Sequence, residues 1–159
     1  MSLITDTVFV KALRSNPTLL AKLAAKDVYN TTIPVPDEEL DNTPIPYVIV
    51  AFNGCKNEAG TKDSLYEGST DSVQISIDVV APTRPQLGEL VTDIRRTVRE
   101  YFENATMDDE DYHQVPTNYE FSADRVIYDD LKPAYGQTLN YQCEVNAEDY
   151  EQEETPSES

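Results

Sequence analysis

Asp130 and Lys132 are the two residues whose types and spacing most resemble a catalytic signature in this chain. They match the D-x-K half of a metal-dependent nuclease motif, which needs both side chains on one strand face beside a further carboxylate. Asp124 or Asp129 would supply that carboxylate for Mg²⁺-dependent DNA cleavage. Pro133 follows directly and its neighbours indicate a turn. We therefore favour a chance match in a very acidic chain, and keep a small nuclease as an alternative function.

The residue types that usually bind transition metals or act as nucleophiles are few and scattered. His113 is the single histidine, and Cys55 and Cys143 lack the paired spacing of a metal site. No G-x-S-x-G segment supports a Ser–His–acid triad, and the acidic run 108–111 lacks the spacing of a calcium loop. We predict that the protein is not an enzyme, with no catalytic, cofactor-binding or metal-binding residues.

Residues 82–86 join an alternating strand to a helix, a place where many α/β proteins bind anions. An anion site there would use Arg84 and free backbone N–H groups, but Pro85 removes one donor. Thr83 and Gln86 form a capping-box pattern that would occupy others. We expect a well-capped helix start at this joint, with no binding site.

The formal net charge of −18 is the most extreme property of the sequence. It argues against unaided binding to nucleic acid or to an anionic membrane, because phosphate contacts need clustered Lys and Arg. Residues 148–159 contain six carboxylates and no basic residue, which indicates an acidic C-terminal tail. On so acidic a protein, Arg95, Arg96 and Arg99 are better suited to ion pairs between subunits than to phosphate binding.

The sequence gives no sign of membrane insertion or secretion. Its longest apolar run, residues 47–52, is far shorter than the ~20 residues that a membrane helix needs. The first residues lack the basic and apolar regions of a signal peptide, and two cysteines do not make a disulfide framework. We expect synthesis and assembly in a reducing cytoplasm.

Hydrophobic periodicity predicts the elements that position these residues. Helices are expected over residues 4–15, in a short segment from Pro17, and over about 83–103. Strands are expected over 27–33, 47–52, 73–81, 119–130 and 137–147, with a loop at 55–71. The 47–52 strand is expected to be buried on both faces and to end at Asn53-Gly54. The predicted fold is α+β, with a mostly antiparallel sheet of about 4–5 strands packed against the long helix and the N-terminal helix.

The order of these elements, with the segments "PYVIV" and "VQISIDVVAPTR", resembles the tail terminator, or tail-completion, proteins of long-tailed bacteriophages and prophages. The resemblance covers about residues 4–147, so we expect one domain over 1–147 followed by the acidic tail, 148–159. It implies a structural virion protein that forms a hexameric ring at the head-proximal end of the tail tube. Such a ring ends tube growth and joins the tail to the head connector. The family offers no catalytic residues to transfer.

The partners implied by this resemblance are further copies of the chain, the tail tube protein below and a connector or stopper protein above, in the virion neck. The charge of −18 adds the hypothesis of an acidic lumen through which DNA passes without specific binding. Another head–tail joining or head-completion protein of the neck is the alternative within the same class. A monomeric acidic adaptor, whose tail binds a basic partner, is a third interpretation.

Overall fold

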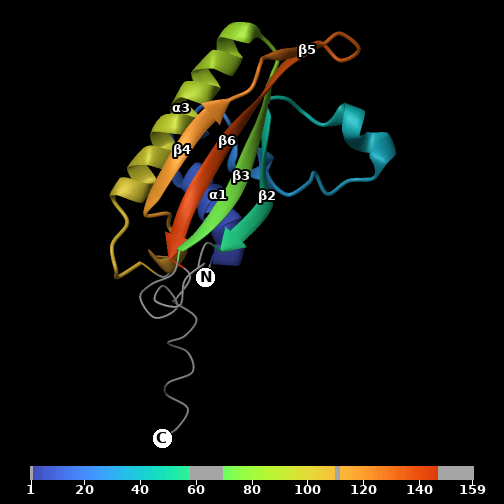
Figure 1. Ribbon diagram of the computed structural model, residues 1–159. Helices are drawn as coiled ribbons and strands as arrows, with labels where there is room; N and C mark the ends of the chain where they lie inside the picture. Colours follow the sequence, from blue (N-terminus) through green and yellow to red (C-terminus); the bar gives the residue numbers. More distant parts are fainter. Residues whose placement is uncertain (1, 58–69, 110–111, 147–159) are drawn as a thin grey trace, which may run out of the picture.

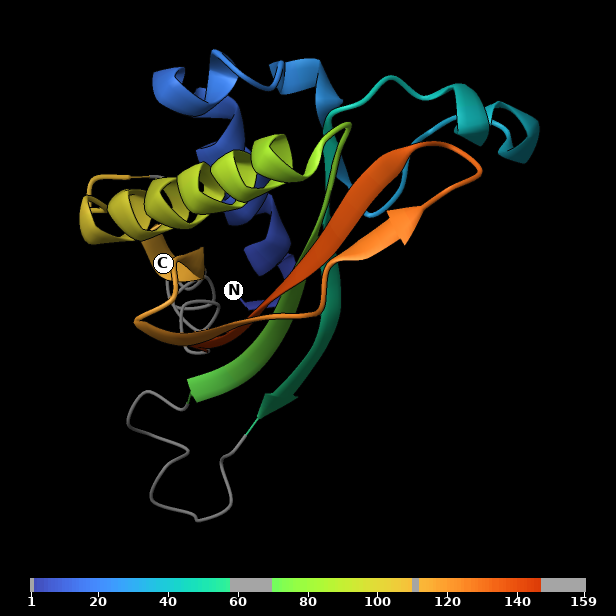
Figure 2. The same ribbon diagram turned by 90° about the horizontal axis from the view of Figure 1, so that it is seen from above.

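The computed structural model describes residues 2–57, 70–109 and 112–146, which form a sheet with helices packed on one face (Figures 1 and 2). The α-helices are α1 (Thr5–Ser15), α2 (Pro17–Leu20) and α3 (Arg84–Glu103). Short 3-10 helices are η1 (Ser2–Ile4), η2 (Ala25–Asp27), η3 (Asp37–Asn42) and η5 (Tyr112–Gln114). The strands are β1 (Val28–Asn30), β2 (Tyr47–Asn57), β3 (Thr70–Ala81), β4 (Asn118–Ala123), β5 (Ile127–Asp129) and β6 (Ala134–Asn146). The predicted acidic tail and most of the predicted 55–71 loop lie outside the described residues.

The sheet has six strands in the order β1-β2-β3-β6-β4, and β5 also pairs with β6. Only the short β1–β2 pair is parallel, and the other described pairs are antiparallel. This arrangement confirms the predicted α+β class and the mostly antiparallel sheet. No helix among the described residues is long and apolar enough to span a membrane.

The segment predicted as one strand over 119–130 forms two strands instead. Residues 124–126 interrupt it, so that β4 pairs with the far part of β6 and β5 pairs with its beginning. The turn at 130–133 then connects β5 to β6 as a hairpin, in agreement with the sequence. The split raises the strand number above the predicted range, because the two short strands share one long partner.

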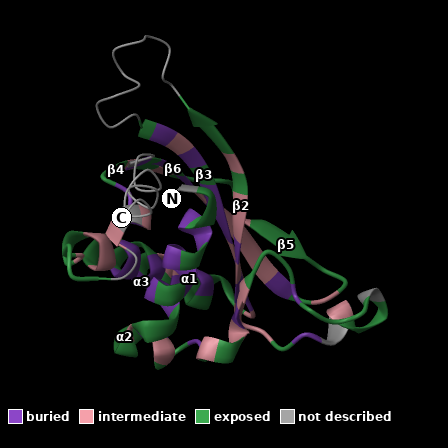
Figure 3. Ribbon diagram, turned by 90° about the horizontal axis from the view of Figure 1, so that it is seen from below, coloured by how far each residue is buried: buried purple, intermediate pink, exposed green. Residues whose placement is uncertain are grey.

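Two predictions for β2 are wrong. The strand does not end at Asn53-Gly54: it continues to Asn57, because a register shift between Phe52 and Gly54 allows pairing with β3 to resume. It is also not buried on both faces, since Val48 and Val50 are buried whereas the alternate residues are half-buried. The helices cover a single face of the sheet, which leaves the other face of β2 partly open (Figure 3).

The core lies between the sheet and the helices α1 and α3. The residues of β3 predicted to face inward are all buried, as are those of β6 that share a face: Val73, Ile75, Ile77, Val79, Leu139, Tyr141, Cys143 and Val145. Helix α3 contributes Leu87, Leu90, Ile94 and Val98, and α1 contributes Val8, Phe9, Ala12 and Leu13. The Phe9 ring packs edge-on against Phe102 of α3 and Tyr141 of β6, both with ring centroids at 5.2 Å. These contacts join the two helices to the sheet.

Candidate functional site

The joint between β3 and α3 is a capped helix start. The backbone N–H of Gln86 donates to the Thr83 hydroxyl at 3.2 Å, and the two side-chain oxygens lie 3.1 Å apart. Thr83 has the extended backbone of an N-cap residue, and Pro85 follows in the first turn. The capping interaction is therefore confirmed, and it occupies donors that an anion would need.

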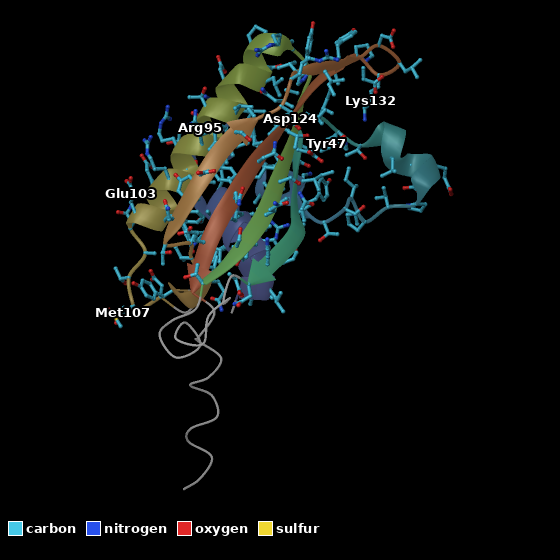
Figure 4. All side chains as sticks on the ribbon, in the orientation of Figure 1. Tyr47, Arg95, Glu103, Met107, Asp124 and Lys132 are labelled. Carbon is cyan, nitrogen blue, oxygen red and sulfur yellow. The ribbon has the colours of Figure 1, made fainter. Side chains whose placement is uncertain are left out.

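A pocket of 350 Å³ lies at the end of the sheet where the β5–β6 hairpin begins; we call it the hairpin pocket. Tyr47 and Ile49 of β2, Asp78 of β3 and Tyr135 of β6 contribute to its lining, together with residues 124–132 in part. Figure 4 shows Tyr47, Asp124 and Lys132 at this end of the molecule. Burial, and then the nearby Asp78 and Asp129, raise the pKa of Tyr47, so its phenol stays protonated at neutral pH.

The structure brings three of the four predicted nuclease residues to this pocket. Asp124, Asp129 and Lys132 line it, whereas Asp130 does not. An Asp129 carboxylate oxygen accepts hydrogen bonds from the backbone N–H groups of Leu131 and Lys132, at 3.0 and 3.4 Å. An Asp124 carboxylate oxygen accepts from the Asn140 amide at 2.9 Å. These two carboxylates therefore stabilise the turn and the strand break locally.

Lys132 is also held by the fold. Its Nζ donates to the backbone carbonyl of Thr43 at 3.0 Å, and so connects the hairpin to the 34–46 segment. Both segments project from the same end of the sheet (Figures 1 and 2). The nuclease motif requires Asp and Lys on one strand face. Asp130 and Lys132 instead lie in the turn between β5 and β6.

The other candidate residues do not assemble into a site. Within the described residues, no group of three or more His, Cys, Asp or Glu side chains is close enough to hold a metal ion. His113 belongs to the 3-10 helix η5. Cys55 is exposed on β2, while burial of Cys143 in the core raises the pKa of its thiol to about 12. At neutral pH the Cys143 thiol therefore stays neutral and poorly nucleophilic.

A second hollow, of 390 Å³, lies between α3 and β4; we call it the arginine groove. Its wall is formed by Thr92, Arg95, Arg96 and Arg99 of α3, and its floor by the rings of Tyr119, Phe121 and Tyr141. Helical spacing alone places the four wall residues on one face of α3. Sequence reasoning missed the aromatic floor, because no local pattern indicates that β4 lies beside this face.

The β5–β6 hairpin exposes large apolar side chains, both on β5 and in the turn at its tip. Leu131 is 94% exposed, Ile127 63% and Tyr128 51%; we call these three residues and the 130–133 turn the hairpin arm. The Tyr128 ring packs against Tyr135 at a centroid distance of 4.8 Å, which stiffens the base of the arm. Apolar residues gathered on a projecting hairpin are typical of a contact surface.

Comparison with known proteins gives a match in structure alone. No protein-family model matches the sequence, and no curated protein matches it either. The fold is similar to that of a chain in the solved structure described as "Virion of native gene transfer agent (GTA) particle". The TM-score is 0.58 at 13% sequence identity, over 89% of this chain and 94% of that chain. At this identity the similarity establishes a shared fold over nearly the full length of both chains.

Proposed function

We propose that this chain is a structural virion protein of a phage-like particle. The observation that carries the proposal is the shared fold with a chain of the gene transfer agent virion, which spans 89% of this chain and 94% of that one. The protein is expected to act through assembly and without catalysis, in the host cytoplasm first and in the finished virion afterwards.

Within that class, we assign it the role of tail terminator. The support is the order of its elements and the segments "PYVIV" and "VQISIDVVAPTR", which resemble that family. In this role six copies form a ring at the head-proximal end of the tail tube, with the tube protein below and the head connector or stopper above. The hairpin arm is a surface on which neighbouring subunits could contact each other.

The charge of −18 suits a ring through which DNA passes. An acidic lumen repels phosphates, so the genome slides without binding. A ring structure with a neutral or basic bore, and all acidic residues outside, would remove this part of the proposal.

The decisive test is deletion of the gene from the genome that encodes this chain. If the protein ends tube growth, the deletion gives overlong tails without heads, and the wild-type particle contains about six copies by quantitative mass spectrometry, in keeping with a closed ring. Absence of the chain from purified particles would overturn the virion role altogether.

The same deletion separates the terminator from the neighbouring neck proteins. Loss of a head-completion or other head–tail joining protein leaves tails of normal length beside heads that release DNA. Tails of normal length in the deletion strain, together with the chain's presence in wild-type particles, would therefore favour that alternative over the terminator.

A further inference from the structure

The arginine groove combines three guanidinium groups with a floor of aromatic rings. The Arg95 guanidinium carbon lies 3.9 Å from the centre of the Phe121 ring, which is a cation–π contact. The Tyr141 ring lies 5.2 Å from Phe121 and 5.5 Å from Tyr119, so the floor is continuous. Stacked arginines beside aromatic rings favour ligands that carry both carboxylates and an aromatic group.

The positive charge in the groove is only partly compensated by the fold. Arg96 forms an ion pair with the buried Asp93 at 3.1 Å, and Asp93 also pairs with Lys22 at 2.7 Å. Arg95 and Arg99 form no salt bridge with any carboxylate among the described residues, and no carboxylate is among the residues that line the groove. On a chain of net charge −18, the groove is therefore a basic surface in which two of the three arginines have no salt bridge among the described residues.

The groove also borders the free edge of the sheet. Among the described strands, β4 pairs with β6 alone, so its other edge has no strand partner. An extended segment that entered the groove could run alongside this edge. Unpaired edges of this kind are normally covered, because they otherwise pair with another chain.

The acidic segment 147–159 has the composition that this groove favours. It contains six carboxylates, one aromatic residue, Tyr150, and no Lys or Arg. Its carboxylates can accept hydrogen bonds from Arg95 and Arg99, and the Tyr150 ring can pack on the aromatic floor.

The chain also leaves the sheet close to the groove. Tyr119 of the floor is the cross-strand partner of Cys143, three residues before the end of β6 at Asn146. Three strand residues span ~10 Å, and the thirteen residues beyond Asn146 can extend over ~40 Å. Helix α3 is ~30 Å long, so the segment can reach every arginine of the groove.

We propose that the arginine groove is the binding site for the chain's own acidic C-terminal segment, residues 147–159. Tethering within one molecule gives the segment an effective concentration in the millimolar range, which favours it over the same segment of another copy. Bound in the groove, it neutralises the uncompensated arginines and covers the free edge of β4. The inference goes beyond the proposed virion role and does not depend on it.

The test uses a fluorescent synthetic peptide of residues 147–159 and five forms of the full chain, of which three are the principal ones. The first is the wild type, and the second carries neutral amides in place of the six acidic residues: E148Q, D149N, E151Q, E153Q, E154Q and E158Q. The third adds Arg95→Gln and Arg99→Gln to the second. Fluorescence anisotropy at protein concentrations where the chain is monomeric measures peptide affinity.

We expect the amide variant to bind the peptide at least about 10-fold more tightly than the wild type, whose own segment competes for the groove. Arg95→Gln with Arg99→Gln should weaken that binding about 10-fold or more, and rising salt should weaken it further. The matched control instead adds Arg84→Gln and Arg125→Gln to the amide variant. These two exposed arginines lie outside the groove, so an equal change in charge there should leave the peptide affinity of the amide variant unchanged.

Two results would overturn the proposal. Equal peptide affinity for the groove variant and the control variant would show that charge alone, not the groove, attracts the segment. Equal affinity for the wild type and the amide variant would show that the chain's own segment does not occupy the site. Arg99→Gln alone, added to the amide variant, serves as a second variant and should also weaken peptide binding. Arg99 makes no hydrogen bond or ion pair among the described residues, so its replacement should not disturb the fold.

Discussion

The arginine groove and the hairpin pocket are hollows of similar volume, 390 and 350 Å³, that use charged side chains differently. In the hairpin pocket, Asp124, Asp129 and Lys132 all form hydrogen bonds that hold the local chain. In the arginine groove, Arg95 and Arg99 have no carboxylate partner among the described residues. The sequence connected the first set with catalysis, whereas the structure commits these three side chains to local hydrogen bonds.

The arginine groove also differs from the hairpin arm, which adjoins the hairpin pocket, in how far the core supports it. Helix α3, which forms the wall of the groove, packs against the core. Its buried side chains are Leu87, Leu90, Ile94 and Val98, so the wall is firmly held. The hairpin arm extends beyond the helices, and its large apolar residues face solvent. Substitutions in the core beneath α3 should therefore change the free energy of unfolding. Substitutions on the arm should change it little and should instead affect the proposed contact between subunits.

The largest effect is expected for Ile94→Ala, behind the groove. Ile94 is fully buried between α3 and the sheet, so its truncation removes apolar contact and leaves a cavity. The expected loss is ~2–5 kcal/mol in the free energy of unfolding, measured by urea denaturation. Ile127→Ala, the matched change on the arm, should cost no more than ~0.5 kcal/mol. Similar losses at both positions would contradict the distinction between a supported groove and an unsupported arm.

The residues that distinguish the two regions were unequally predictable from the sequence. The inward residues of β3, β6 and α3 follow regular periods of apolar type, because one face of each element must be buried. The capping box was equally predictable from the sequence, because Gln86 follows Thr83 by only three positions and the motif is therefore local. These features determine the fold class and the position of the long helix.

The features that were missed depend on contacts between distant segments. Nothing local marks the break at 124–126, which has no Gly or Pro and arises because β4 and β5 share the long strand β6. The extension of β2 depends on a bulge whose partner strand is β3. The aromatic floor of the groove forms because Phe121 meets Arg95, which lies 26 positions earlier in the chain.

The second prediction concerns Cys143, which lies under the groove as the cross-strand partner of Tyr119. Its pKa in the folded protein is raised to about 12, above the ~8.5 of an unfolded thiol. The folded state therefore holds its proton more firmly, and stability present below pH ~8.5 is lost as the pH rises. Between pH 7 and pH 10 this linkage amounts to ~2 kcal/mol.

The measurement is the free energy of unfolding at both pH values for the wild type, Cys143→Ala and Cys55→Ala. The wild type and Cys55→Ala should lose ~2 kcal/mol more than Cys143→Ala, because Cys55 is exposed. Parallel pH profiles for all three proteins would mean that the Cys143 thiol does not retain its proton in the folded state.

The third prediction tests the helix that forms the wall of the groove. Thr83→Ala removes the hydroxyl that accepts from the Gln86 N–H, and should lower the free energy of unfolding by ~1 kcal/mol. Thr92→Ala is the matched control within the same helix, where the hydroxyl donates to the Gly88 carbonyl and is exposed. It should be neutral within ~0.5 kcal/mol, because Ala favours a helix interior. Equal costs at the two positions would mean that the cap does not stabilise α3.

The smallest effect on stability is expected for Leu131→Ser, at the tip of the hairpin arm. Leu131 is 94% exposed, so the folded chain loses almost no apolar contact, and the free energy of unfolding should change by less than ~0.5 kcal/mol. If the chain forms the proposed ring and the arm is a subunit contact, the same substitution should reduce the fraction of oligomer in native mass spectrometry, because an apolar anchor at an interface is lost. Lys132→Gln provides the contrast: it breaks the hydrogen bond to the Thr43 carbonyl, so it should loosen the arm against the 34–46 segment and lower stability modestly. A Leu131→Ser protein that is destabilised yet assembles normally would place this side chain in the packing of the subunit. The arm would then resemble the wall of the arginine groove, and the contrast between the two regions would fail.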